Sequence, residues 1–134
     1  MQATFRRDLG ELERAFRLAD KFARERRLGE TAVYLLNLAV EEIFTNIVKH
    51  GARGGGDIAI ALDVAGGELV VEIVEHGAQP FDPTQAPEAD VRAPLDERQP
   101  GGLGLYMLRK LMDDMTYEYT DGEAHIRMTK RLED

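Results

Sequence analysis

Residues 37–51 read NLAVEEIFTNIVKHG, and the spacing of the apolar positions in and just before this stretch predicts a long helix. These positions follow one another in steps of three and four residues: Val33, Leu36, Val40, Ile43 and Ile47. Such a stripe lies along one side of a helix and packs against a hydrophobic core. We therefore expect the rest of the fold to be built around this helix.

Two polar residues, Glu42 and Asn46, lie off the apolar stripe, one helical turn apart and on the same face. A carboxylate and a carboxamide held side by side could share a hard cation, or place a general base beside one. Taken alone, such a pair is more often part of a solvated helix face. Lys49 and His50 continue this polar face, where His50 would complement the dipole at the end of the helix.

The composition limits the function classes. The length of 134 residues fits one domain, 1–134, and 43% hydrophobic with 31% charged residues is typical of a globular protein. A net charge of −8 argues against nonspecific binding to nucleic acid, which needs cationic surfaces. The chain has no cysteine and no serine, which excludes disulfides, cysteine-bound zinc and a serine nucleophile. There is no signal-peptide pattern and no apolar run long enough for a membrane helix, so we expect a soluble cytoplasmic protein.

The segment ahead of the long helix predicts a short edge strand at residues 3–5 and a first helix from Asp8 to about Arg27. Asp8 is a typical N-cap residue, and Glu11 three residues later completes a capping-box pattern. This helix carries many Arg and Lys residues within an acidic protein. They form either a solubilising face or a docking surface for an acidic partner helix.

Alternating apolar and other side chains predict two hairpins, one after the long helix and one at the end of the chain. The predicted strands are residues 57–64, 69–74, 115–120 and 124–131. With the first strand they predict a mixed, mainly antiparallel sheet of four or five strands. Three helices, the third beginning near Gly101, would cover one face in a two-layer α+β sandwich.

Residues 78–101 contain all five prolines of the chain and show no regular pattern. An irregular stretch of about 20 residues inside a small domain is usually a lid or a binding loop. A disordered insertion is the other interpretation. We expect a lid over a ligand site.

Glycine-rich sequence follows this stretch, where Gly101-Gly102-Leu103-Gly104 opens the third helix. Glycines remove Cβ atoms that would keep an anion away, and N–H groups at a helix start favour phosphate. The same glycines also fit a turn or a packing contact.

Before the predicted lid, Glu75-His76-Gly77 follows the end of a strand. A buried carboxylate at this point could accept a hydrogen bond from the exocyclic amine of a purine, and Gly77 would let the chain turn and a flat ring approach. An acidic residue that faces water is the alternative.

The order of these pieces resembles the anti-sigma-factor serine/threonine kinases of the RsbW and SpoIIAB type. They form a branch of the superfamily of ATP-binding domains shared by histidine kinases, Hsp90, gyrase B and MutL. The resemblance covers essentially the whole chain and implies a Bergerat-type ATP-binding fold. The matching motifs are Glu42-Ile43-Phe44-Thr45-Asn46, Glu75-His76-Gly77 with Phe81-Asp82-Pro83, and Gly101-Gly102-Leu103-Gly104-Leu105 with Leu111-Met112-Asp113.

The resemblance implies a role for the residues around the phosphates. Asn46 would coordinate Mg²⁺ bound to ATP, and Glu42 would take the proton from a serine or threonine hydroxyl of a partner. Gly102 and Gly104 would cradle the phosphates beneath the lid, residues 78–101. The resemblance also places these residues at the nucleotide: His50, Phe81, Gly101, Leu103 and Leu105.

At the adenine end, the resemblance implies that Glu75 accepts a hydrogen bond from the adenine amine and that Gly77 lies against the ring. The family usually has Asp at this position, and the added methylene of Glu moves the carboxylate by over about 1 Å. One residue more than expected separates Gly77 from Phe81. Gly122-Glu123-Ala124 stands where the family often has Gly-Thr, whose threonine supports the adenine end.

By this resemblance we expect the chain to be an ATP- and Mg²⁺-dependent protein serine/threonine kinase and anti-sigma factor. Its partners would be a sigma factor and a STAS-type anti-anti-sigma protein, which it would phosphorylate. The family often forms homodimers, and a second copy would cover the open sheet face or the first strand. An alternative, motivated by Glu75 and the missing Gly-Thr, is a non-catalytic module that binds a regulator with weakened or lost ATP binding. A third hypothesis is the detached catalytic domain of a histidine kinase that phosphorylates a histidine in trans. The short chain and the sequence GGLGL disfavour it.

Overall fold

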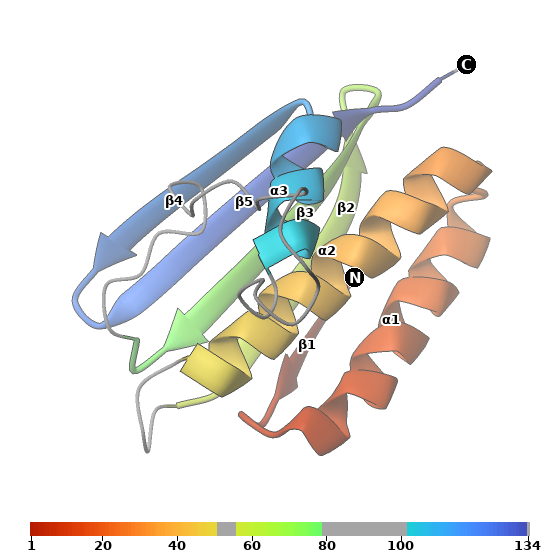
Figure 1. The fold of residues 1–134 in the computed structure, drawn as a ribbon. Coiled ribbons are helices and arrows are strands. Elements are labelled where there is room, and N and C mark those ends of the chain that lie inside the picture. Colours follow the sequence, from red (N-terminus) through yellow and green to blue (C-terminus); the bar gives the residue numbers. More distant parts are fainter. Residues whose placement is uncertain (51–55, 79–101, 134) are drawn as a thin grey trace.

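A computed structural model of the chain describes residues 1–50, 56–78 and 102–133. They form two layers, with a five-stranded sheet behind a layer of helices (Figure 1). The elements are β1 (Gln2–Phe5), the 3₁₀ turn η1 (Leu9–Glu11), α1 (Leu12–Glu25), α2 (Glu30–His50), β2 (Ile58–Ala65), β3 (Glu68–His76), α3 (Gly102–Leu111), β4 (Asp114–Thr120) and β5 (Glu123–Arg131). The predicted sandwich with three helices on one face is confirmed.

The strands lie in the order β1-β2-β3-β5-β4, and all four pairings between neighbours are antiparallel. The sheet therefore has the larger of the two predicted strand numbers, and its described strands include no parallel pair. β3 and β5 lie side by side although α3 and β4 come between them in the sequence. Their register places Glu75 opposite Ala124.

Helix α2 runs through the middle of the helical layer, between α1 and α3 (Figure 1). Four residues of the predicted apolar stripe are buried in the core: Leu36, Val40, Ile43 and Ile47. Val33 is partly buried and Phe44 is fully buried, because α2 packs on the sheet and on both neighbouring helices. By length and composition α2 could cross a membrane, but its apolar side chains other than Tyr34 are buried or partly buried in this core.

The start of the first helix differs from the prediction. Asp8 caps the short turn η1, where its Oδ1 accepts a hydrogen bond from the N–H of Gly10 at 2.9 Å. The carboxylate of Glu11 accepts from the backbone N–H of Arg6 at 3.1 Å, and not from Asp8. The second half of the predicted capping box is therefore wrong, because the 3₁₀ turn directs Glu11 back toward the end of β1. The helix ends at Glu25, and Arg27 beyond it has a left-handed φ of 53°.

Both hairpin turns have two consecutive residues with positive φ. Gly66 and Gly67 have φ of 60° and 77°, and Asp121 and Gly122 have φ of 51° and 80°. Such pairs are typical of the type I′ turn, whose twist matches that of the flanking strands. These turns fix the register of the sheet, and β3 continues beyond the predicted residue 74 to His76.

Candidate functional site

The C-terminal half of α2 faces the first turn of α3 through Glu42. The carboxyl group of Glu42 lies against Gly104 so closely that a Cβ at residue 104 would overlap the carboxyl carbon and both oxygens. Asn46 follows one turn further along α2 and, like Glu42, is half-buried. Two motifs that are far apart in the sequence therefore meet at this point.

The surroundings of Glu42 change its acidity. Burial raises the pKa of the Glu42 carboxyl, the nearby negative charge of Glu41 raises it further, and Lys49 lowers it. Within the described part of the chain, Glu42 has no ion-pair partner. A half-buried carboxylate with a raised pKa and no fixed cation is suited to accept a proton.

Helix α3 begins at Gly102, so Gly102, Leu103 and Gly104 lie in its first turn. The N–H groups of a first helical turn have no partners within the helix and can hold an anion. Leu103 is 39% exposed, whereas Leu105 is buried in the core at 3%. Leu105 is therefore restricted to contacts through its backbone.

At the end of β3, Glu75 is buried, with 7% of its surface exposed. Nη1 of Arg7 lies 2.6 Å from Oε2 of this carboxylate. Nη2 of Arg7 donates to the carbonyl of His76 at 2.9 Å, and Nη1 donates to the carbonyl of Ile47 at 3.4 Å. The residue expected to face a purine is thus buried and paired with a cation.

Sequence reasoning did not single out Arg7. A buried carboxylate needs a cation or several hydrogen-bond donors. This rule predicts a partner for Glu75, but it does not say which of the 17 Lys and Arg residues supplies it.

The chain turns sharply after Glu75-His76. Gly77 has φ of 67°, a left-handed conformation that favours glycine. The N–H of Ala78 then donates to the carbonyl of Gly122 at 2.7 Å, and its carbonyl accepts from the hydroxyl of Tyr119 at 3.2 Å. The first residue of the predicted lid is therefore attached to the turn between β4 and β5.

Opposite Glu75 on β5, the buried Ala124 offers no hydroxyl group. The neighbouring Glu123 contacts Nδ1 of His76 at 2.6 Å and Nε2 of His125 at 3.5 Å. These two histidines meet at one carboxylate although they are scattered in the sequence. Among the residues that the structure describes, no group of three or more histidine or acidic side chains is placed to hold a metal ion.

Some predicted site positions lie outside the described residues. They include Phe81, Gly101 and the predicted lid from residue 79 onward. His50 is the last residue of α2, but its side chain is outside the description. The roles of these residues stay predictions.

The described residues fit ATP with Mg²⁺ by donor chemistry. Carboxylate and carboxamide oxygens such as those of Glu42 and Asn46 are ligands that Mg²⁺ prefers. The missing Cβ of Gly104 lets the Glu42 carboxyl group lie against the first turn of α3. At the other end, Arg7 joins Glu75 to Ile47, the residue after Asn46. Glu42 and Asn46, which suit a metal and phosphate, therefore lie on the same helix that Arg7 connects to Glu75. The buried carboxylate of Glu75 suits the purine base of a nucleotide.

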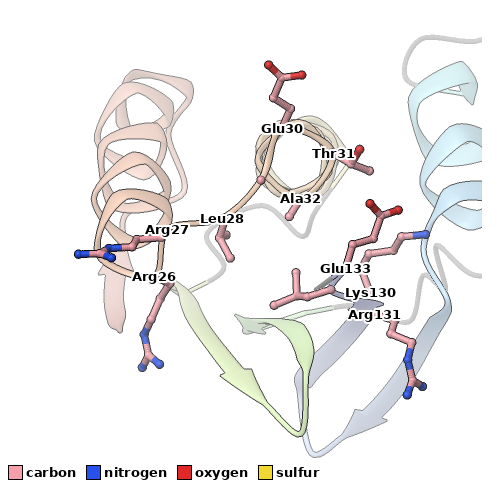
Figure 2. A pocket seen from close by; sticks show the side chains of 11 residues that line it. Arg26, Arg27, Leu28, Glu30, Thr31, Ala32, Lys130, Arg131 and Glu133 are labelled. Carbon is pink, nitrogen blue, oxygen red and sulfur yellow. The ribbon is translucent and has the colours of Figure 1, made fainter.

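A separate cavity of about 500 Å³ lies at the opposite end of α2 (Figure 2). Four cationic residues line it: Arg26, Arg27, Lys130 and Arg131. The side chains of Arg26 and Arg27 point away from the cavity (Figure 2), and Arg26 lies 3.6 Å from Asp63. Lys130 donates to the carbonyl of Leu111 at 3.0 Å. Because Arg26, Arg27 and Lys130 are turned away or engaged, we assign no ligand to this cavity.

Comparison with known proteins identifies relatives of this arrangement. Residues 5–130 match the family described as histidine kinase-like ATPase domain. The serine/threonine-protein kinase BtrW of Bordetella bronchiseptica is 36% identical over 98 residues, which cover 72% of this chain and 68% of BtrW. The serine-protein kinase RsbW of Listeria monocytogenes is 34% identical over 107 residues, which cover 75% of this chain and 67% of RsbW.

The fold also matches a solved structure. The crystal structure of the RsbU and RsbW domains of Rv1364c from Mycobacterium tuberculosis superimposes with a TM-score of 0.70 and 16% sequence identity. The match covers 98% of this chain and 31% of that longer chain. At this identity the likeness concerns the fold.

Proposed function

We propose, from the premise that this chain belongs to the histidine kinase-like ATPase domain family, that it is an ATP- and Mg²⁺-dependent protein serine/threonine kinase. The family implies an ATP site, and the serine kinases RsbW and BtrW are relatives of the chain. The observation that carries the proposal is the contact of the Glu42 carboxyl group with Gly104. This contact supports the proposal because the general base that activates the hydroxyl and the turn that binds the phosphates must lie together for phosphoryl transfer.

In this proposal, the hydroxyl oxygen of a serine or threonine on the partner bonds to the γ-phosphorus of ATP, and ADP leaves. Glu42 accepts the proton of that hydroxyl. The raised pKa of the Glu42 carboxyl suits this role. Bound ATP with Mg²⁺ supplies the phosphoryl group and neutralises charge on it. Asn46 would hold the metal through its amide oxygen, and the N–H groups near Gly102 and Gly104 would hold phosphate oxygens.

We infer the partners from the resemblance to anti-sigma-factor kinases. The phosphate acceptor would be a STAS-type anti-anti-sigma protein, and a sigma factor would be the second, competing partner. Both act in the cytoplasm, where we place this chain. A second copy on the open sheet face or on β1 stays a prediction.

The alternative is a module that binds a regulator without using nucleotide. The engagement of Glu75 by Arg7 favours it, because the carboxylate that would read a base is already paired. Ala124 opposite Glu75 also lacks a hydroxyl that would support the base. The two functions differ in whether ATP changes the partner complex.

The function is tested with the wild-type protein, ATP, Mg²⁺ and the cognate STAS-type protein. We expect calorimetry to detect ATP binding, and phosphate to appear on a serine or threonine of the partner only when Mg²⁺ is present. Absence of transferred phosphate at millimolar ATP would contradict the kinase proposal. Tight partner binding that neither ATP nor ADP alters would establish the binding module.

The pH dependence of transfer offers a further prediction. Burial raises the pKa of Glu42, and the group must be ionised to act as a base. We therefore expect kcat/KM to fall on the acid side of the profile at a pH above the ordinary pKa of a glutamate. The measurement is the initial rate of phosphate transfer as a function of pH.

Two neighbours of Glu42 give controls of opposite sign. Glu41 raises the pKa of Glu42 and Lys49 lowers it. Glu41→Gln should therefore move the acid limb to lower pH, and Lys49→Met should move it to higher pH. If both substitutions leave the limb in place, another group controls it.

A further inference from the structure

The ion pair between Arg7 and Glu75 has no role in the function as described so far. We propose that Arg7 is a specificity-determining residue, which positions the carboxylate of Glu75 to accept a hydrogen bond from the exocyclic amine of a 6-aminopurine nucleotide. This inference rests on the proposed nucleotide site. It assigns to Arg7 the selection of adenine over 6-oxopurines.

The contacts of Arg7 fix its guanidinium group in one orientation. Nη1 lies 2.6 Å from Oε2 of Glu75, and Nη2 donates to the carbonyl of His76 at 2.9 Å. Nη1 also donates to the carbonyl of Ile47 at 3.4 Å. The side chains of Arg7 and Glu75 are 10% and 9% exposed, so water competes little for these contacts. A planar guanidinium held at both terminal nitrogens directs the carboxylate that it binds.

These contacts join three parts of the chain. Arg7 follows β1, Ile47 lies in the C-terminal half of α2, and Glu75 lies at the end of β3. Through Arg7, the carboxylate of Glu75 is therefore tied to the helix that carries Asn46. The distance between the two ends of the proposed site is set in part by this one side chain.

The second carboxylate oxygen of Glu75 is the atom that would bind the nucleotide. Arg7 contacts Oε2, and Oε1 has no partner among the residues that the structure describes. An ionised carboxylate only accepts hydrogen bonds. It therefore matches the 6-amino group of adenine, which donates, and it repels the 6-oxo group of hypoxanthine or guanine, which accepts.

The longer side chain of Glu75 explains why such a partner is needed. Glu has one more rotatable bond than the Asp usual in the family, so its carboxylate is less well placed by the backbone alone. Ala124 across the strand pair contributes no polar side chain to the task. Arg7 removes this freedom by holding one oxygen.

One donor of Arg7 argues against a purely structural pair. The Nε–H of Arg7 is buried and has no hydrogen-bond partner among the described residues. Buried donors in native proteins are almost always satisfied, and those that are not often serve a function. Buried ion pairs are also weak devices for stability compared with apolar packing.

The test compares the binding of ATP and ITP, which share the ribose and triphosphate but differ at position 6 of the purine. The full chain is used as wild type, Arg7→Met, Arg7→Lys and the matched control Arg6→Met. Arg6 is adjacent to Arg7, and its side chain is 78% exposed. Calorimetry gives the two dissociation constants, and unfolding without nucleotide shows which variants are folded.

We expect the wild type and Arg6→Met to prefer ATP over ITP. In Arg7→Met the affinity for ATP should fall about tenfold, the effect of one hydrogen bond to a charged group, while the affinity for ITP stays unchanged. Arg7→Lys keeps the charge but cannot make all three contacts, so it should lose part of the preference. If Arg7→Met does not fold, Arg7→Lys decides the test.

Three results would overturn the inference. Equal losses of ATP and ITP affinity would show that Arg7 only supports the fold. A rise in ATP affinity in a variant without Arg7 would show that the ion pair of Arg7 with Glu75 keeps adenine out. An unchanged preference in a folded Arg7→Lys variant would show that Arg7 does not position Glu75. A wild type that binds neither nucleotide would instead overturn the proposed function, and this inference with it.

Discussion

Glu42→Gln is expected to lower phosphoryl transfer by about 10²–10⁴-fold, the usual contribution of a general base. The carboxamide has the size of the carboxylate and can stay against Gly104, but it does not accept the proton of the acceptor hydroxyl. Nucleotide affinity should be equal to or above that of the wild type, because a negative charge near the phosphates is removed. Rates of phosphate transfer and calorimetric affinities for ATP measure the two effects.

The control for this variant is Glu41→Gln, which makes the same chemical change on the adjacent, exposed position of α2. We expect it to retain transfer at neutral pH, apart from the shift of the acid limb already described. Transfer by Glu42→Gln at the wild-type rate would show that another group accepts the proton. Loss of ATP binding in the same variant would show that Glu42 serves the nucleotide instead.

Gly104→Ala is expected to reduce transfer by about 100-fold, the effect of displacing a catalytic group by about 1 Å. The new Cβ would occupy the space of the Glu42 carboxyl group. That group is the flexible end of a side chain, so it can swing away without unfolding the protein. Alanine is also more favourable than glycine inside a helix by about 1 kcal/mol, so α3 itself should not be weakened.

Gly29→Ala is the matched control, because a Cβ at residue 29 meets nothing within 4 Å. Both variants should remain folded, and only Gly104→Ala should lose transfer. A Gly104→Ala protein with full activity would mean that the position of Glu42 in contact with Gly104 is not needed for the reaction.

The sequence was a good guide to the helices and the hairpins. The steps of three and four around Val40 and Ile43 have one structural solution, a helix with a buried side. Gly66-Gly67 and Asp121-Gly122 are turn sequences with a specific backbone geometry. The start of the first helix was not predicted correctly. The 3₁₀ turn before α1 depends on the hydrogen bond that Glu11 accepts from the N–H of Arg6, which the sequence pattern does not specify.

The site was predictable only in part. The resemblance predicted that Glu42 and the glycine motif belong to the same ATP site. In the structure, the carboxyl group of Glu42 lies against Gly104. The partner of Glu75 was not predictable, since Arg7 reaches it across the end of β2 only after the sheet has formed. The meeting of His76 and His125 at Glu123 follows likewise from the register of β3 with β5.

The two glycines in the first turn of α3 also bear on how ligand and fold are coupled. This helix has only ten residues, Gly102–Leu111, and glycine lowers the intrinsic tendency of a segment to be helical. A short, glycine-bearing helix opens more easily than α2, which lies in the core on several sides. An anion held at its first turn would therefore slow amide exchange there and raise the melting temperature through linkage.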